Sequence, residues 1–402
     1  MSTTRSTALN LSAPPVMGKI QNRSLIIGIV LGIVSVAGAL LRTDEFFRAY
    51  LLGYMLWLGV TLGCMAILMI RHLTGGAWGY VVRRLQGAAM RTLPLVTILF
   101  IPIFFGFSHL YIWARPLNSV TDQHLRAHLQ QIESSYLNVP GFIWRTVIYF
   151  AIWNLLSFFL TRWSRQQDRP PVVDRSRRFK AVSAAGLILY AFTISFAAID
   201  WVMSLDPSWI STIYGLIILI GELLSAMCFT VVIEKILINY QPMSGLLKDD
   251  YIHDHGKWIL TFIMVWAYFS FSQLLIIWAG NLPDEITWYT RRLAGGWEFV
   301  AIALAVFHFA VPFLMLLSRP LKRSLGQLVW VAILLLVMCY VDMFWIIEPN
   351  FSQTITITWL DIVVPIALGG IWLAYFCRNL RSLPLLALYD VHAVEVLEPG
   401  HE

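Results

Sequence analysis

Residues 211–238 read STIYGLIILIGELLSAMCFTVVIEKILI. From Ser211 to Ile233, Glu222 is the only Asp, Glu, Lys or Arg. A run of this length crosses the hydrocarbon core of a bilayer, which takes about 20 predominantly apolar residues as a helix. No polar stripe interrupts it, as one does in a helix at the surface of a soluble core. The stretch therefore predicts a transmembrane helix with Glu222 near the midplane.

Nine other runs of this kind make the chain a polytopic membrane protein. Of its 402 residues, 58% are hydrophobic and 13% are charged, whereas about a quarter are charged in a soluble domain. We expect an all-α fold of about ten transmembrane helices. Their predicted ranges are 24–41, 46–70, 93–113, 141–163, 179–203, 211–238, 258–279, 295–317, 325–348 and 356–377.

The Lys and Arg residues are unevenly divided between the two membrane faces that these helices imply. Alternate connections lie on opposite faces, and 22 basic residues fall on the face of the two chain ends. The other face holds seven, which accounts for all 29. Basic residues are in excess in cytoplasmic connections, so both ends are predicted to be cytoplasmic. The net charge of +6 is thus a membrane signal, and no nucleic-acid partner is expected.

An internal repeat relates the third to fifth predicted helices to the seventh to ninth. Residues 107–110 read FSHL and residues 271–274 read FSQL. Residues 200–207 read DWVMSLDP and residues 342–349 read DMFWIIEP, so both have Asp, five residues, an acid and Pro. The matching helices are four apart, an even number, so the two halves insert in the same orientation.

The repeat predicts two similar four-helix bundles with two flanking helices. The predicted division is a cytoplasmic tail at 1–23, the first helix at 24–45, bundles at 46–210 and 211–350, the tenth helix at 351–377 and a cytoplasmic tail at 378–402. Two glycine pairs, Gly28 with Gly32 and Gly59 with Gly63, have the spacing that permits close helix packing.

Ionisable groups inside the apolar runs are the candidate functional residues, because they are costly in a bilayer. From the middle of the membrane outward they are Glu222 and His308, then His109, Asp200, Asp342 and Asp361, with Glu298 at the outer edge; the inner motif supplies His253, Asp254, His255 and Lys257. No Lys or Arg lies in the middle of a predicted span, so we expect these acids to be unpaired and to hold protons. Groups placed in steps between the two faces predict a proton path. The alternative is structural: Asp200 and Asp342 ending helices at the interface, and His308 bonded within the core.

No redox cofactor or metal is expected on this chain. The four cysteines each lie in an apolar run and none forms CxxC or CxxCH, which iron–sulfur, zinc and c-type haem sites use. Haem b in a bundle needs facing histidines, and His109 and His308 are predicted at different depths.

Eight matches, taken in their order, resemble the ActF subunits of bacterial alternative complex III, which belong to the NrfD-like family of quinone-module membrane subunits. They are WLGVTLG at 57–63, HLTGGAWG at 72–79, RTLP at 91–94, DW at 200–201 with DP at 206–207, HDHGK at 253–257, WAYFSFSQ at 266–273, WAGNLP at 278–283 and PFLMLLSR at 312–319. The resemblance runs from about residue 40 to 385. His255 departs from it, because Leu is usual at that position in the family.

The resemblance implies a multi-pass subunit, in the bacterial inner membrane, of a quinol:electron-acceptor oxidoreductase that replaces the cytochrome bc complex. It implies quinol as substrate, and partners that carry the c-type haems and iron–sulfur clusters: an ActC-like sister subunit, an iron–sulfur subunit and c-type cytochrome subunits. The lipid bilayer and the quinone pool are the other partners. ActF-like subunits bind no haem or cluster and are proposed to conduct protons.

Two other functions stay open on the residues alone: a stand-alone proton-coupled transporter and an NrfD-like membrane anchor of another reductase. Helices broken by Gly or Pro at matching midplane positions of the two halves would favour a transporter. The sequence offers no convincing pair.

Overall fold

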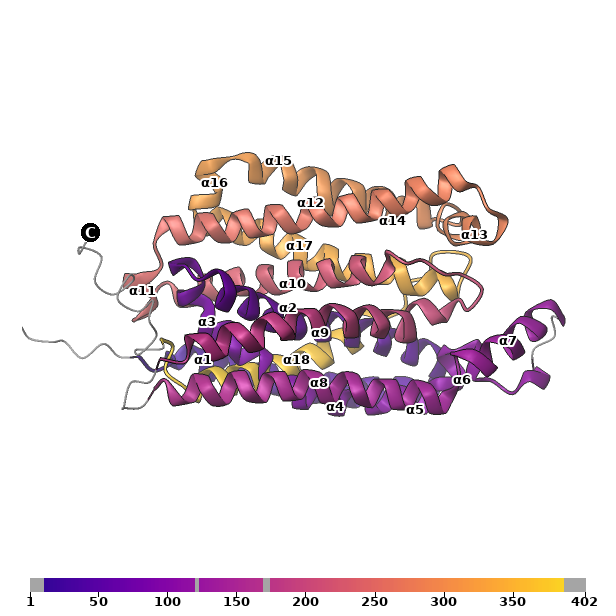
Figure 1. The fold of residues 1–402 in the computed structure, drawn as a ribbon, viewed down its shortest axis with the longest axis horizontal. Helices are drawn as coiled ribbons and strands as arrows, with labels where there is room; N and C mark the ends of the chain where they lie inside the picture. The colour runs from indigo at the N-terminus through magenta and orange to yellow at the C-terminus, as the bar shows by residue number, and fades with distance from the viewer. Residues whose placement is uncertain (1–10, 120–122, 169–173, 387–402) are drawn as a thin grey trace, which may run out of the picture.

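The computed structural model describes residues 11–119, 123–168 and 174–386. Ten helical stretches in these residues are long and apolar enough to cross a membrane, which confirms the predicted all-α, ten-span fold. The stretches run side by side along the long axis of the molecule (Figure 1). Parts of the predicted tails, residues 1–10 and 387–402, lie outside the described residues.

Eight spans are single helices and two are composite. The single helices are α1 (Pro15–Leu41), α2 (Thr43–Thr74), α8 (Val139–Gln166), α9 (Ser176–Trp201), α10 (Tyr214–Leu237), α12 (Asp249–Gly280), α17 (Leu325–Ile347) and α18 (Leu360–Arg381). The third span consists of α3 (Ala77–Met90), α4 (Leu93–Leu99) and α5 (Ile101–Phe105), and the eighth of α14 (Trp297–Ala303), η4 (Leu304–Ala310) and α15 (Val311–Leu317). The connections carry α6 (Phe107–Leu110), η1 (Ile112–Ala114), η2 (Leu117–Ser119), α7 (Gln123–Ser135), η3 (Met203–Leu205), α11 (Met243–Leu246), α13 (Pro283–Arg292), α16 (Arg319–Arg323) and η5 (Glu348–Asn350).

Several helices begin before the residue that the apolar pattern predicts. The first begins at Pro15 instead of residue 24, the third at Ala77 instead of 93, and the seventh at Asp249 instead of 258. Pro15 stands at the first helical position, where its fixed φ suits a helix and its missing N–H costs nothing. Asp249 and Asp250 lie in the first turn of α12, where the helix dipole favours acids. Hydropathy marks the membrane-crossing part of a helix and misses such polar extensions.

The two ends of the molecule are distinguished by short helices. We call the end with α7 and α13 the outer end and the end with α11 and α16 the inner end, following the charge-based prediction (Figure 1). The first and last described residues lie close together at the inner end, where the Leu385 N–H donates to the Leu11 carbonyl at 2.8 Å.

Helices α2 and α10 pack against each other at the centre of the molecule. Figure 1 shows α12, α14 and α15 on one side of this pair and α4 and α8 on the other. The same pairings recur in both halves: α2 packs on α9 as α10 packs on α17, and α8 packs on α9 as η4 packs on α17. Outside the two bundles, α1 and α18 pack on each other, and α18 also packs on α2.

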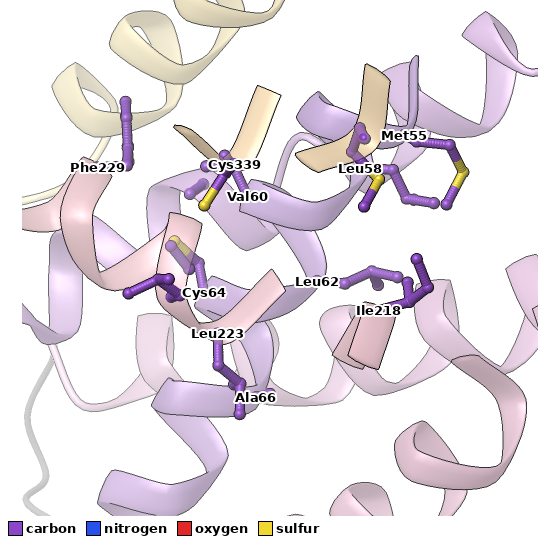
Figure 2. Close-up of a cluster of buried hydrophobic side chains, with 14 of the residues drawn as sticks. Met55, Leu58, Val60, Leu62, Cys64, Ala66, Ile218, Leu223, Phe229 and Cys339 are labelled. Carbon is purple, nitrogen blue, oxygen red and sulfur yellow. The ribbon is translucent and has the colours of Figure 1, made fainter. Parts of the chain in front are cut away.

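The contact between α2 and α10 is apolar and tight. Figure 2 shows side chains from both helices together with Cys339 of α17; the labelled ones are Met55, Leu58, Val60, Leu62, Cys64, Ala66, Ile218, Leu223 and Phe229. A Cβ on Gly63 would lie 2.1 Å from the carbonyl oxygen of Glu222, so only glycine permits this approach. Gly59 also faces Glu222, and Gly28 faces the backbone of α18, whereas Gly32 has nothing within 4 Å. Close packing thus holds for three of the four predicted glycines.

Candidate functional site

Glu222 lies in the centre of the molecule, where α2 and α9 pack on α10. Its side chain is 4% exposed. The Tyr190 hydroxyl of α9 donates to its Oε2 at 2.6 Å, and its Oε1 has no hydrogen-bond partner in the described part of the chain. No charged side chain of the described residues acts on it. A carboxyl group in this setting can hold or pass a proton, because nothing nearby fixes it as an anion.

A small cavity joins Glu222 to Asp342. Its volume is about 20 Å³, and both acids line it, together with Gly59, Ser225 and Cys339. A water needs roughly 10–15 Å³ of such space and two to four polar partners. The cavity therefore has room for one water between the two carboxyl groups. Like Glu222, Asp342 has no cation acting on it among the described residues, and its Oδ2 accepts from the Trp266 indole N–H at 3.0 Å.

His308 joins this group through Trp266. The two rings are stacked, with centroids 4.1 Å apart, and His308 is fully buried. Neither ring nitrogen makes a well-formed hydrogen bond to the described residues, although the Met338 backbone is close enough to interact. The structure thus brings together three of the predicted candidates, Glu222, Asp342 and His308.

The helix that carries His308 is distorted for a reason visible in the sequence. Pro312 has no N–H to donate to the His308 carbonyl, four residues earlier, and its ring would crowd that carbonyl in a regular α-helix. Residues Leu304–Ala310 form a π-helical segment instead, in which the Val311 N–H donates to Val306. Such segments are frequent at functional sites, because they redirect side chains.

A larger cavity lies on the opposite side of Asp342 and opens toward the lipid-facing surface. Its volume is about 570 Å³, within the usual range for small-molecule sites. The wall is mostly apolar and comes from α10, α12, α13, α17 and the π-helical span; Tyr268 and Phe271 stand at the exposed side, 66% and 60% accessible. The polar groups in it are few, among them Asp342, Gln273 and Tyr289. The Nε1 of Trp345, which also lines it, is buried with no acceptor among the described residues.

Helix α13 forms the outer wall of this cavity and is anchored by a buried arginine. Arg292 donates to the Trp345 and Ile346 carbonyls at the end of α17, at 3.1 and 2.7 Å. A cation at these unpaired carbonyls is favourable. Burial lowers the pKa of Arg292 to about 9 and raises that of Tyr289 to about 12. At neutral pH Arg292 is therefore still charged, and the Tyr289 hydroxyl keeps its proton as a donor toward the cavity.

Asp200, the repeat counterpart of Asp342, is paired with a cation, and the expectation that it is unpaired is wrong. The Arg145 guanidinium donates to both of its oxygens, at 2.9 and 2.8 Å, and the Tyr149 hydroxyl donates at 2.8 Å. Arg145 belongs to the second turn of α8, and its side chain reaches a buried acid on the neighbouring helix. Asp200 is thus part of a hydrogen-bonded ion pair with Arg145.

The other outer candidates lie apart from the central group. His109 stacks on Phe47 at the partly exposed outer surface, with its Nδ1 2.6 Å from the Asp44 carboxylate. Glu298 accepts from the Gly296 N–H at 2.9 Å and closes the first turn of α14. Asp361 does the same for α18 by accepting from Thr358. Glu298 and Asp361 therefore stabilise the first turns of their own helices.

At the inner end only one residue of the predicted motif points inward. His255 is fully buried, with Nε2 3.1 Å from the Trp78 carbonyl and Nδ1 3.0 Å from the Glu234 carboxyl. Because a carbonyl can only accept, Nε2 is the donor to Trp78, and Nδ1 faces the Glu234 carboxyl group. Asp254 and Lys257 pair on the surface at 3.0 Å, and His253 is half-buried.

The inner and the central groups of the predicted path are well separated along α10. Glu234 and Glu222 are twelve residues apart on α10, about 18 Å at 1.5 Å per residue. Thr230 and Ser225, which lie between them, donate to carbonyls of α10 itself. The stepwise proton path between these two groups therefore stays a prediction.

No arrangement typical of a metal site occurs in the described ranges: no group of three or more His, Cys, Asp or Glu side chains could hold an ion there. The four cysteines are free and buried. His109 lies on α6 in a connection at the outer surface, and His308 lies in the core within the eighth span.

Sequence reasoning missed the partners of the acids. Arg145 and Tyr149 are four residues apart, so they share a face of α8 and could have been recognised as a pair reaching one acid. Nothing in the sequence marks Tyr190 and Trp266 as partners of these acids, because a single aromatic residue in an apolar run looks like any other core residue. Comparison of the chain with protein-family models and with curated proteins gives no match.

Proposed function

We propose that this chain is the cofactor-free, quinol-facing subunit of a quinol:electron-acceptor oxidoreductase of the alternative complex III type. The observation that carries the proposal is the position of Asp342, which lines both the lipid-facing cavity and the water-sized cavity at Glu222. A ligand that enters from the membrane would meet a carboxyl group with a second one behind it.

A quinol suits the larger cavity in shape and chemistry. Its apolar tail matches the wall toward the lipid, and its two hydroxyl groups match the few polar groups around Asp342. Oxidation of a quinol to a quinone releases two protons and two electrons. Asp342 and Glu222 are acceptors for the protons, and the electrons pass to haem- and cluster-bearing partner subunits.

The stand-alone transporter is less well supported. Under the repeat, the broken eighth span corresponds to the fourth, and α8 is one continuous helix from Val139 to Gln166. The other composite span, the third, corresponds to α12, which is also continuous. The breaks therefore do not occur at matching positions of the two halves, as they do in repeat-built transporters.

The proposal is tested by purifying the tagged chain from its native membranes in mild detergent. We expect c-type cytochromes and an iron–sulfur subunit to copurify, detected by a haem stain and subunit identification, and the preparation to oxidise quinol. A chain that purifies alone would contradict the proposal and favour a transporter. Copurification with a molybdenum subunit would favour an anchor of another reductase.

The role of the cavity is tested in the same preparation with Asp342→Asn. The substitution keeps the shape and removes the proton acceptor, so we expect quinol oxidation to fall about tenfold or more, which corresponds to ~1.4 kcal/mol on the limiting step. Asp284→Asn, at the exposed start of α13 and outside the cavity wall, is the matched control and should keep full activity. Normal quinol oxidation in an assembled Asp342→Asn complex would refute this site.

A further inference from the structure

A second large groove lies on the opposite half of the molecule, at its inner end. It has a volume of about 1180 Å³ and is lined by α8, by the junction of α3 and α4 in the third span and by α18 with the residues after it. From Ala151 to Arg165 it follows α8 over 14 residues, about 21 Å. Half of a hydrocarbon core is about 15 Å, so the groove extends from the inner surface to near the midplane.

The groove changes from apolar to cationic along its length. Near the midplane Leu155 and Phe158 are exposed, at 55% and 54%, on a face turned away from the protein core. At the inner end stand three arginines, Arg91, Arg162 and Arg165. This is the profile of a lipid molecule, with a chain in the membrane and a head group at the surface.

The positive charge at the inner end is not neutralised by the described residues. None of the three arginines has a carboxylate among them within salt-bridge distance. Arg91 donates to Ser382 and to the Asn379 carbonyl, which bring no charge. Arg165 and the neighbouring Arg84 are close enough to repel it.

One carboxylate does lie at the groove, and it is already paired. Asp168 accepts from Arg84, and burial raises the pKa of Asp168 despite that partner. The four arginines therefore exceed the single acid by three charges, and hydroxyl groups of Ser157 and Thr161 line the same wall.

We propose that this groove binds an anionic glycerophospholipid of the inner leaflet, with its phosphate at Arg91, Arg162 and Arg165 and an acyl chain along Leu155 and Phe158. Guanidinium groups match phosphate in charge and hydrogen-bond geometry. Basic pockets between transmembrane helices on the cytoplasmic side are a known setting for such head groups. The inference is independent of the quinol function.

The test is native mass spectrometry of the purified protein, titrated with phosphatidylglycerol and with phosphatidylcholine of the same acyl chains. We expect phosphatidylglycerol to bind preferentially and the double substitution Arg162→Gln with Arg165→Gln to weaken that binding about tenfold. The control, Arg177→Gln with Arg178→Gln, removes the same charge from exposed inner residues outside the groove and should bind normally. Thermal unfolding of both variants in neutral detergent checks that they fold.

Three results would overturn the proposal. Equal loss in both double variants would mean general attraction to the basic inner surface. Equal binding of the two lipids would mean that the phosphate charge is not recognised. Displacement of bound phosphatidylglycerol by millimolar inorganic phosphate would mean a site for a free anion.

Discussion

Two aspartates in matching sequence positions have opposite electrostatic settings. Asp200 holds the Arg145 guanidinium and the Tyr149 hydroxyl, whereas Asp342 has only an indole N–H. The bidentate guanidinium gives Asp200 charge-assisted hydrogen bonds, which are stronger than the bond that the neutral indole gives Asp342. The two halves of the molecule therefore have the same helix pairings but differ at this position, where one acid has a cationic partner and the other has none among the described residues.

Glu222→Gln is the sharpest test at the residue scale. Glutamine keeps the volume and can still accept from Tyr190, so we expect assembly and quinol binding to remain. It cannot take up a proton, so proton release or turnover should fall about tenfold or more, equivalent to ~1.4 kcal/mol. The measurement is quinol oxidation with simultaneous proton counting in reconstituted vesicles.

Glu298→Gln is the matched control for that experiment. It makes the same chemical change in an acid that accepts from the Gly296 N–H at the outer edge, and it should leave both rates unchanged. Normal turnover with a normal proton-to-electron ratio in Glu222→Gln would leave Glu222 as a residue that only ties α9 to α10.

For single residues, the sequence predicts which side chains are buried but not which of them contact each other. Depth along a helix follows from counting residues, and Glu222 is buried within α10, as its place in the apolar run predicts. Whether Asp342 faces Glu222, Trp266 or lipid depends on the rotation of three helices about their axes. The pairing of Asp200 with Arg145 depends on the same rotation, which is why it was missed.

Among the elements, the central helix pair depends on glycine. A Cβ at Gly63 would meet the Glu222 carbonyl oxygen and the Ala226 Cβ, at 2.1 and 2.7 Å. The obstacle is largely backbone, which cannot rotate away as a side chain can. The close approach that glycine permits also brings Glu222 against α2, where the small cavity forms.

We expect Gly63→Ala to destabilise the protein by about 1–3 kcal/mol, the usual cost of overpacking. Thermal unfolding in detergent measures it. Gly32→Ala is the control: nothing lies within 4 Å of its Cβ, and alanine favours the helix by up to about 1 kcal/mol. A Gly63→Ala protein as stable as the Gly32→Ala protein would show that α2 and α10 can separate without cost.

Element boundaries were predictable only where the chain is apolar. The span α17 begins at the predicted residue 325, because a polar inner segment precedes it directly. The third span begins 16 residues before its predicted start, because Arg83 and Arg84 make residues 77–90 look like a polar loop in the sequence. Both arginines are buried at the inner end. Arg84 is hydrogen-bonded to Asp168 in the connection between α8 and α9, so a charge that is unusual in a membrane helix has a partner in the structure.

On the scale of the whole molecule, the halves place their large cavities at opposite ends. The cavity at Asp342 is in the second half beneath α13, and the arginine-lined groove is in the first half at the inner end. Two halves with the same helix pairings thus each have a recess, one toward each end of the bundle. The few charged residues in each recess decide what it can bind. The cavity in the second half contains one acid, Asp342, whereas the groove in the first half contains more arginines than acids.

The orientation in the membrane is the remaining whole-molecule prediction. Ten spans are an even number, so both ends of the described chain lie at the same end of the bundle, as the Leu385–Leu11 hydrogen bond shows. Which face this is depends on the 22-to-7 division of the basic residues. Reporters fused after Glu402 and within residues 165–178 should therefore signal the cytoplasm. Reporters within 114–140 and within α13 should both signal the outside, because α7 and α13 share the outer end (Figure 1). If both predicted inner sites signalled the outside and both predicted outer sites signalled the cytoplasm, the fold would stand and the orientation would be reversed. If the two sites of one pair signalled different sides, the ten-span arrangement itself would be contradicted.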